Sequence, residues 1–320
     1  MSAEISQIPG LMQEVPLSIL HLFDRAERYF GHKTIVTATG TGIERTTYAQ
    51  WAKRTRQVGT VLDQLGISSN GRVATFAWNT ARHLELYFAA PCTGRVLHTL
   101  NIRLFPEQLT YIVNHAQDEV IFVDKSLLGL LAPLLPTFTT VKHLVIMDDG
   151  KGEIPADLAG IASYDYEELL AKAEPAQFVE VPENTAASMC YTSGTTGNPK
   201  GVVYTHRSTF LHTMATMMTD GLGVSESDKI LPVVPMFHAN AQYYSTMSAL
   251  VSGGSVAVMH RFSASAWGEQ ARRHAATLGS LFAAPVRMIL AQPAPPTVAS
   301  NSLRATYFGQ NVSSAQLRDF

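Results

Sequence analysis

One short stretch concentrates the residues that could bind an anion. Between Met189 and Arg207 the sequence reads MCYTSGTTGNPKGVVYTHR, so apolar runs flank a segment of small, hydroxyl-bearing residues. The nine positions from Thr192 to Lys200 hold three threonines, one serine, two glycines, one asparagine, one proline and one lysine. Glycines let backbone N–H groups converge on an anion because no Cβ blocks their approach. The hydroxyls add donors and Lys200 adds a mobile charge, so the composition predicts a loop that wraps a polyphosphate.

Two comparisons test this interpretation within the sequence. The P-loop pattern GxxxxGK[ST] is not met, because Lys200 follows Pro199 and precedes Gly201. A plain turn between two strands is the simpler alternative, and it explains residues 197–199. It does not explain the five hydroxyl or glycine positions immediately before them. Phosphate binding is therefore the favoured hypothesis, with the plain turn left open.

The loop lies in a chain whose apolar segments alternate in length. Short β-branched runs predict buried strands, and stretches with helical spacing lie between them. The predicted strands read GRVATFAW, RVLHTL, EVIFVD, KHLVIMDD, KILPVV, SVAVMH and LRATYF. Strand–helix–strand repetition of this kind gives parallel sheets with right-handed crossovers, so the sequence predicts an α/β fold.

Local signals predict where individual elements begin and end. Thr47 suits the N-cap of a helix over TTYAQWAKRTRQVGTVLDQLG, and Gly66 suits the left-handed position after it. Pro106 suits the first helical position of FPEQLTYIVNHAQD, where a missing N–H costs nothing. The run KTIVTATGTGIERTTY holds two strand-like segments around a Gly-Thr-Gly turn, which predicts an antiparallel hairpin.

The composition narrows the class of protein. Of 320 residues, 46% are hydrophobic and 16% charged, which predicts a sizeable core and excludes a disordered chain. A formal net charge of −2 provides no global field for nucleic acid, so no nucleic-acid partner is expected. The two cysteines, Cys92 and Cys190, lie in apolar segments without a CxxC neighbour. We interpret both as buried small hydrophobes and predict neither a disulfide framework nor a zinc site. The Met-rich segment STFLHTMATMM is likewise predicted to be core.

No segment has the pattern of a targeting or membrane-spanning element. The first residues, MSAEISQIPGLMQEV, carry an acid where a signal peptide carries a base, and they lack an apolar region. The segment LLGLLAPLLPTF comes nearest to a membrane span, but it is short and interrupted by prolines. The sequence therefore predicts a cytoplasmic protein without a transmembrane segment.

A polar connection, AEPAQFVEVPENT, divides the chain into two groups of β/α units. We expect a first subdomain over residues 1–182 and a second, which carries the phosphate loop, over residues 183–320. The segment SSAQLRDF starts a helix that Ser313 or Ser314 would cap, and the sequence stops in its first turns. A helix needs roughly ten residues or more to be worth forming. The second subdomain is therefore expected to be incomplete, which makes the chain a fragment or a natural truncation.

Several of these stretches resemble one family. YTSGTTGNPKGV resembles the signature loop of the AMP-binding, adenylate-forming superfamily, which includes acyl-CoA synthetases, firefly-luciferase-like enzymes and peptide-synthetase adenylation domains. VVPMFHANA resembles that family's next motif. CTGRVLHTLNIRLFPEQLTYIVNHAQDEVIFVD resembles fatty-acid and short-to-medium-chain acyl-CoA synthetases, whereas NAQYYSTMSALVSGGSVAVMHRFSAS is similar to crotonobetaine/carnitine-CoA ligase-like members. The resemblance covers essentially the whole chain, but its two hints do not agree on one acid.

The resemblance implies a fold and a reaction. The fold would be the large N-terminal domain of adenylate-forming enzymes, with stacked β/α subdomains and mainly parallel sheets, and without the small C-terminal cap domain. The reaction would be that of an ATP-dependent acyl-CoA ligase. A small carboxylic acid or fatty acid attacks the α-phosphorus of Mg-ATP, and the thiol of CoA then displaces AMP. ATP, Mg²⁺ and CoA are thus implied as ligands. A carrier-protein thiol stays open as the acceptor, and a homodimer stays open as the assembly.

The resemblance also assigns roles to individual residues. The phosphates would be held by the loop positions Thr192, Ser193, Gly194, Thr195, Thr196 and Gly197, with Lys200 near the leaving pyrophosphate. Gly309 and Gln310 stand where the family has an adenine-contacting Gly-Gly-Ala-like turn, and only Gly309 matches it simply.

The acyl pocket forms a second group of implied residues. His238 would be a catalytic residue at the junction of the acyl pocket and the thiol tunnel. The other pocket candidates are Phe237, Asn240, Gln242 and Tyr243. Taken by itself, His238 fits a satisfied, partly buried histidine better, and it is the PMFHANA motif that favours the pocket role.

The family pattern is not complete within this chain. A Tyr-Gly-x-Thr-Glu motif, a ribose-binding aspartate, a hinge and the catalytic lysine would follow Phe320. Because such groups stabilise charge that develops in the transition state, we expect the 320 residues alone to form little or no acyl-adenylate. The competing hypothesis is a truncated, non-catalytic module that holds nucleotide or acyl groups. A kinase-like phosphotransferase is excluded, since the sequence has neither a Walker loop nor an HRD-type loop.

Overall fold

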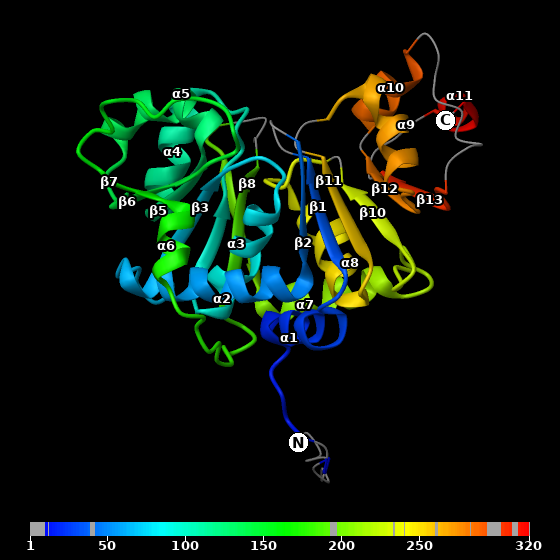
Figure 1. Ribbon diagram of the computed structural model, residues 1–320, viewed down its shortest axis with the longest axis horizontal. Helices are drawn as coiled ribbons and strands as arrows, with labels where there is room; N and C mark the ends of the chain where they lie inside the picture. The colour runs from blue at the N-terminus through cyan, green and yellow to red at the C-terminus, as the bar shows by residue number, and fades with distance from the viewer. Residues whose placement is uncertain are drawn as a thin grey trace, which may run out of the picture.

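Two β-sheets stand side by side in the computed structural model of the chain, with helices packed on their faces (Figure 1). The structure describes residues 10–11, 13–38, 42–192, 197–232, 234–239, 241–259, 262–281, 283–292, 302–308 and 313–319. The predicted α/β class is confirmed, because strands and helices alternate along most of the chain.

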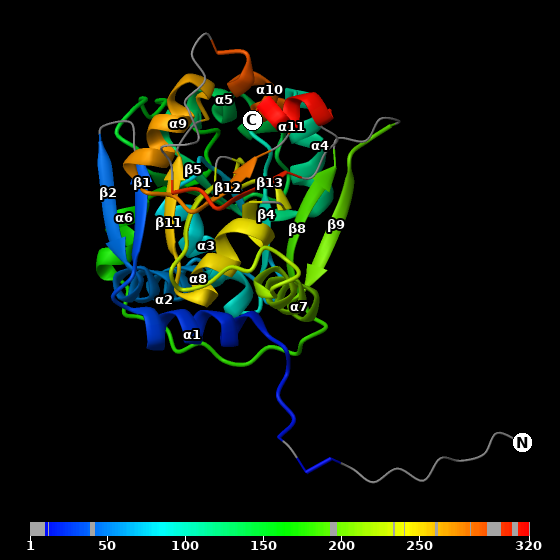
Figure 2. The ribbon, with the colours of Figure 1, turned by 90° about the vertical axis from the view of Figure 1, so that its right-hand side faces the viewer.

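Within those residues, the larger sheet has seven strands in the order β7-β6-β5-β3-β4-β8-β9. The strands are β3 (Arg72–Phe76), β4 (Val96–Thr99), β5 (Asp118–Asp124), β6 (His143–Met147), β7 (Ala162–Asp165), β8 (Ala186–Thr192) and β9 (Lys200–Thr205). Every neighbouring pair runs parallel except β8 and β9, which form an antiparallel hairpin at one edge. Figure 2 shows this hairpin with α7 at its foot.

The second sheet has six strands among the described residues, in the order β13-β12-β10-β11-β1-β2. The strands are β1 (Thr34–Ala38), β2 (Ile43–Thr47), β10 (Lys229–Pro232), β11 (Ser255–Met259), β12 (Leu278–Leu281) and β13 (Ala305–Phe308). The pair β1–β2 is antiparallel, which confirms the predicted hairpin, and the other pairs are parallel.

The two sheets share the chain in an interleaved way. The early hairpin β1–β2 joins the strands β10 to β13, whereas β8 and β9 join the strands that precede them. Sheet membership therefore changes twice along the chain and does not follow the expected boundary between residues 182 and 183. The two subdomains as folding units stay a prediction.

The helices that pack on these sheets vary in length. They are α1 (Ile19–Phe30), α2 (Tyr48–Gln64), α3 (Ala81–Cys92), α4 (Pro106–Ala116), η1 (Lys125–Leu127), α5 (Leu128–Leu131), η2 (Ala132–Thr137), α6 (Tyr166–Lys172), α7 (His206–Met217), η3 (Ala241–Thr246), α8 (Met247–Ser252), α9 (Ala264–Arg273), α10 (Ala283–Leu290) and α11 (Ser314–Asp319). None of the helices in the described ranges has the length and apolar character that crossing a bilayer requires.

Local chemistry positions α2 as predicted. The Thr47 hydroxyl accepts from the Gln50 N–H over 3.2 Å, and the Gln50 side chain accepts from the Thr47 N–H over 2.9 Å. This reciprocal capping box satisfies donors that a helix start leaves open. Gly66 follows the helix with a φ of +67°, the left-handed conformation that glycine tolerates best. Pro106 opens α4, so the third local prediction is confirmed as well.

The core follows from the alternation of side chains along the central strands. Val120 and Phe122 of β5 pack in one cluster with residues of α1, α2, α3, α8 and the six-stranded sheet. Ile121 and Val123 face the opposite side and pack with α4 and α5. Because successive side chains of a strand point to opposite faces, the larger sheet is covered on both faces. The first cluster joins the two sheets, since it contains strands of each.

Two predictions about buried residues are confirmed only in part. Leu211 and Met214 of α7 are 45% and 41% exposed, while Thr209 and Thr213 are buried. Only part of the Met-rich segment is therefore core, since its residues Phe210 and Met217 pack against the main cluster. The buried hydroxyl of Thr213 donates to the Thr209 carbonyl oxygen within the helix, which makes its burial inexpensive. Cys190 is only half-buried, whereas Cys92 is buried as predicted.

Candidate functional site

The β8–β9 hairpin carries both ends of the predicted phosphate loop. Thr192 is the last residue of β8, Lys200 is the first of β9, and the two pair in register. The Thr192 hydroxyl donates to the Lys200 carbonyl oxygen over 3.5 Å. The loop residues Ser193, Gly194, Thr195 and Thr196 lie outside the described residues.

The second half of the loop is shaped for an anion to approach. Gly197 has a φ of +92°, and among the described residues no atom beyond its chain neighbours lies within 4 Å of the position that a Cβ would take. Pro199 is buried and anchors the turn to the hairpin. Lys200 is exposed and forms no ion pair with any residue that the structure describes. An ammonium group in this position is available for a phosphate oxygen.

A cavity of about 330 Å³ opens beside Thr192. Three residues predicted from the sequence, Thr192, Phe237 and His238, line it together. The remaining lining residues come from several elements and are Thr99, Asn101, Leu104, Ile112, Cys190, Tyr191, Tyr204 and Ala239. The structure therefore brings the end of the phosphate loop and the PMFH motif to one space large enough for part of an organic ligand.

The cavity lies at the carboxyl ends of two neighbouring parallel strands. Thr99 ends β4 and Thr192 ends β8, and these strands pair directly. Ligands of open α/β sheets bind at this edge. Asn101 and Leu104, which follow β4, were missed because their residue types carry no chemical signal. Their position after the predicted strand RVLHTL is the signal that could have located them.

His238 is exposed at the cavity, next to Phe237, and the two ring centroids are 4.9 Å apart. Its N–H donates to the Pro235 carbonyl oxygen over 2.9 Å, and its own carbonyl oxygen accepts from the Ala241 N–H over 3.0 Å. Partial burial of the ring, together with the charge of Arg103, holds the pKa of His238 below its usual value. The imidazole is therefore neutral near pH 7 and can accept a proton or a hydrogen bond.

Of the other predicted pocket residues, the structure describes the side chain of Gln242 only. Gln242 is buried in η3, a π-helical turn, and it is not among the residues that line the cavity. The Thr246 hydroxyl donates to the Ala241 and Gln242 carbonyl oxygens and so stabilises that turn. Turns of this type often occur at functional sites. Asn240, Gly309, Gln310 and the side chain of Tyr243 lie outside what the structure describes.

Tyr191 at the base of the loop is held by a network that sequence reasoning missed. Its hydroxyl lies 2.7 Å from His115 Nδ1, and the His115 ring stacks on Tyr111 with centroids 5.2 Å apart. On its other side lies His98, whose Nδ1 is 2.9 Å from both carboxyl oxygens of Asp118. Burial raises the pKa of Tyr191 to about 12, and the nearby Asp118 carboxyl adds to this. Tyr191 therefore presents a neutral, fixed hydroxyl beside the cavity.

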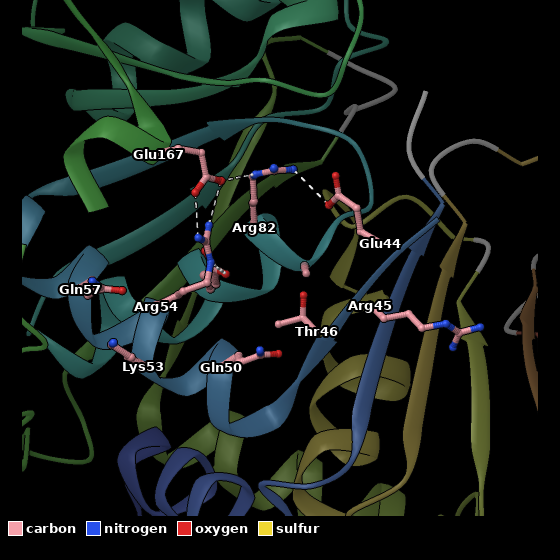
Figure 3. Close-up of a pocket in the computed structure, with 11 residues that line it drawn as sticks. Glu44, Arg45, Thr46, Gln50, Lys53, Arg54, Gln57, Arg82 and Glu167 are labelled. Atoms are coloured by element: carbon pink, nitrogen blue, oxygen red, sulfur yellow. Dashed lines mark hydrogen bonds and ion pairs between the residues drawn. The ribbon is translucent and has the colours of Figure 1, made fainter. Parts of the chain in front are cut away.

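A larger cavity, of about 510 Å³, lies elsewhere and contains none of the predicted site residues. Figure 3 shows Glu167 between Arg54 and Arg82 in its wall. Arg54 forms ion pairs with Glu85 at 2.6 Å and with Glu167 at 2.8 Å, and Arg82 forms one with Glu167 at 2.9 Å. The carboxylates already neutralise these two guanidinium groups. Arg45 and Lys53 line this cavity as well, but it contains no described residue of the phosphate loop. The smaller cavity is the better candidate for a polyphosphate ligand because Thr192 of that loop lines it.

The described residues do not by themselves fit a Mg²⁺ site. Across the described ranges, no three acidic, histidine or cysteine side chains gather as metal ligands. The cavity beside Thr192 offers hydroxyls, an amide, a thiol and an imidazole, but its lining includes no carboxylate. Mg²⁺ prefers oxygen ligands and commonly binds through one or two carboxylates plus substrate phosphates. Among the described residues, this cavity therefore provides no carboxylate for Mg²⁺, and the ion would have to enter as a complex with the phosphates of the nucleotide.

Comparison with known proteins gives a consistent result. The family model described as AMP-binding enzyme matches residues 22–320. The 3-methylmercaptopropionyl-CoA ligase of Ruegeria lacuscaerulensis is 46% identical over 234 residues, which make up 72% of this chain and 43% of that protein. The medium-chain-fatty-acid–CoA ligase of Ectopseudomonas oleovorans is 43% identical over 234 residues, or 72% of this chain and 42% of that protein. The chain thus spans less than half the length of these relatives.

A solved structure shows the same fold at lower sequence identity. The crystal structure of the anthranilate CoA ligase AuaEII in complex with anthranoyl-AMP matches with a TM-score of 0.84 and 20% identity. The match covers 95% of this chain and 58% of that one. The expected fold, that of the N-terminal part of adenylate-forming CoA ligases, is therefore confirmed.

Proposed function

The chain belongs to the AMP-binding enzyme family, and from that premise we propose that it forms the nucleotide- and acyl-binding part of an AMP-forming acid–thiol ligase. One observation carries the proposal: Thr192, at the end of the phosphate loop, lines the same cavity as Phe237 and His238. Joining a carboxylate to a nucleotide requires both reactants to be held within bonding reach, which a shared cavity provides.

The proposed reaction has two steps. A carboxylate oxygen attacks the α-phosphorus of ATP, which forms acyl-AMP and releases pyrophosphate. The sulfur of CoA then attacks the acyl carbon, which forms the thioester and releases AMP. Mg²⁺ bound with the nucleotide would neutralise phosphate charge. In both steps the protein acts by positioning its substrates and by stabilising the charge that develops.

The described residues suit distinct parts of this reaction. Lys200, exposed and free of ion pairs within the described residues, would contact the pyrophosphate, and Thr192 would add a hydroxyl from β8. Gly197 keeps the turn open for close approach of phosphate oxygens. His238 would stand where the acyl group meets the thiol, and its neutral imidazole can accept a hydrogen bond from the thiol. Ser193 to Thr196 complete the proposed phosphate loop, and Gly309 and Gln310 the proposed adenine contact.

The acid itself is proposed only as a class. The relatives named above act, by their names, on 3-methylmercaptopropionate, on medium-chain fatty acids and on anthranilate. One methylene changes the discrimination of a hydrophobic pocket by only about 1–3 kcal/mol. We therefore propose a carboxylic acid of small to medium size, with CoA as acceptor, in the cytoplasm. A homodimer and a carrier-protein acceptor stay open.

Nucleotide binding tests the loop directly. We would titrate the chain with ATP by calorimetry and compare Lys200→Ala with Lys172→Ala, which removes an exposed lysine from the distant helix α6. A hydrogen bond to a charged group contributes about 1.5–3 kcal/mol, so Lys200→Ala should weaken ATP binding by about tenfold or more. Lys172→Ala should leave it unchanged. A crystal structure with ATP bound away from the β8–β9 hairpin would refute the proposal.

Product formation tests the chemistry. The uninterrupted reading frame, incubated with ATP and a panel of carboxylic acids, should yield acyl-AMP detectable by mass spectrometry, and the thioester once CoA is added. The 320 residues alone should yield little, because groups that act in the transition state are expected elsewhere. If the full reading frame binds ATP at the hairpin but no acid yields acyl-AMP, the non-catalytic module is the correct function.

A further inference from the structure

The segment that carries Phe237 and His238 is held by the sheet to which it does not belong. Residues 234–239 follow β10, a strand of the six-stranded sheet, and lead into η3. The side chains that bind their backbone come from the seven-stranded sheet and from the α3 region that follows β3. They are Asn79, Tyr87 and Thr99.

Asn79 makes the most specific of these contacts. Its amide nitrogen donates to the Val234 carbonyl oxygen over 2.9 Å, and its amide oxygen accepts from the Met236 N–H over 2.7 Å. One planar side chain thereby binds a donor and an acceptor two residues apart. Asn79 is only 4% exposed, so water cannot readily replace these bonds. A buried amide with both partners satisfied defines one backbone position.

Two hydroxyls extend the contact toward His238. The Tyr87 hydroxyl donates to the Met236 carbonyl oxygen, and the Thr99 hydroxyl donates to the Phe237 carbonyl oxygen over 3.2 Å. Both side chains are buried. The Tyr87 and His83 rings pack in an edge arrangement with their centroids 5.1 Å apart. His83 Nε2 in turn forms a hydrogen bond with the Thr75 hydroxyl of β3. The contact is therefore anchored in the central strands of the larger sheet.

This arrangement links the segment that carries Phe237 and His238 to the strands beside the phosphate loop. Thr99 ends β4, and β4 pairs directly with β8, which leads into the phosphate loop. We infer that Asn79, Tyr87 and Thr99 form a clamp that positions Phe237 and His238 relative to the β8 end of the phosphate loop. The inference that these residues position substrates for ligation rests on the proposed function. The inference that they fix the backbone of residues 234–239 does not. Without the clamp, two sheets that shift against each other would separate the acyl group from the nucleotide.

A matched pair of tyrosine variants tests the clamp. Tyr87→Phe removes a buried hydroxyl that donates to the Met236 carbonyl oxygen, and Tyr48→Phe removes one that donates to the Gly254 carbonyl oxygen, away from the cavity. Both should lower the urea midpoint similarly, because each leaves a buried carbonyl oxygen without its donor. Amide hydrogen exchange of residues 234–238 should become at least tenfold faster in Tyr87→Phe. It should stay within twofold of the parent chain in Tyr48→Phe.

A second pair and an activity measurement separate positioning from stability. Thr99→Val removes the hydroxyl at nearly constant shape, and Thr99→Ser keeps it. In the full reading frame, Tyr87→Phe and Thr99→Val should lower kcat by about tenfold with the KM for ATP within twofold. Thr99→Ser should lower kcat less than Thr99→Val, and Tyr48→Phe should retain kcat. The clamp is refuted if Tyr87→Phe and Tyr48→Phe give the same exchange at residues 234–238. If exchange behaves as expected but the parent protein forms no acyl-AMP, the proposed function fails and the clamp remains.

Discussion

Replacing Gly253 by alanine tests how closely helices α8 and α1 pack against each other. Gly253 ends α8 with a φ of +77° and is buried beneath Phe30 of α1. A Cβ built at this position would lie 2.3 Å from Phe30 Cδ1 and 2.5 Å from Phe30 Cε1. Carbon atoms in contact are ordinarily about 3.5–4.0 Å apart. Alanine would therefore have to displace a ring that belongs to the core.

The expected destabilisation has two parts. The left-handed backbone conformation costs a residue with a Cβ about 1–2 kcal/mol. Overpacking a filled core site costs about 1–3 kcal/mol more. We therefore expect Gly253→Ala to lower the free energy of unfolding by about 2–5 kcal/mol. Gly66→Ala is the matched control. Gly66 has a φ of +67°, but in the part of the chain that the structure describes no atom beyond its chain neighbours lies within 4 Å of the point where a methyl group would lie. A loss of about 1 kcal/mol is therefore expected there.

Urea unfolding monitored by circular dichroism measures both variants against the parent chain, with the slope m checked for constancy. The double variant Gly253→Ala/Phe30→Leu should recover about 1 kcal/mol or more of the loss, since the smaller side chain makes room for the methyl group. Equal losses in Gly253→Ala and Gly66→Ala would show that the ring contact contributes nothing, and the reasoning would then be wrong.

Three further predictions concern buried charge, pH and thiol chemistry. Glu85→Ala should destabilise the chain by about 3–5 kcal/mol in urea unfolding, because it removes the buried partner of the half-buried Arg54. Glu44→Ala, at an exposed and longer ion pair, should cost under about 1 kcal/mol. Burial lowers the pKa of His206 from 6.5 to about 4, so its contribution to stability is complete above pH 6.5 and is lost as pH falls toward 4. The loss should approach about 3 kcal/mol near pH 4, and His206→Gln should flatten the pH dependence of the urea midpoint in that window. Under native conditions N-ethylmaleimide should label the half-buried Cys190 and spare the buried Cys92, which peptide mass spectrometry can measure. A ligand in the cavity beside Thr192 should slow the labelling of Cys190, because Cys190 lines that cavity. Labelling of Cys92 at a similar rate would contradict its burial.

Some residues of the candidate cavity carry a signal in the sequence, and others do not. Thr192, Phe237 and His238 line one cavity. Thr192 was predicted from the composition of its loop, whereas Phe237 and His238 were predicted from the resemblance of their segment to a family motif. Asn101 and Leu104 line the same cavity without such a signal. Asn79 was missed for the same reason, since a single asparagine before a helix is normally interpreted as a cap or turn residue.

The error on α7 has a physical cause that composition conceals. Leu211 and Met214 are exposed, and Thr209 and Thr213 are buried, which is the reverse of their hydrophobicity. Threonine can be buried in a helix when its hydroxyl donates to a carbonyl oxygen in the preceding turn, as Thr213 does. The orientation of a helix is then decided by its neighbours, and apolar residue counts cannot supply that information.

The amino-acid sequence by itself determined the features that depend on neighbouring residues. The capping box at Thr47, the left-handed Gly66 and the hairpin of β1 and β2 all depend on backbone chemistry within a few residues. The phosphate loop and its family resemblance are equally local. Tertiary structure alone decided which strands share a sheet, as in the parallel pairing of Ile35 with Val256. It also decided that Asn79 holds the backbone beside His238. Such contacts form only when burial of apolar surface offsets the entropy lost in closing long loops. This free-energy balance depends on residues throughout the chain and cannot be evaluated from a short segment.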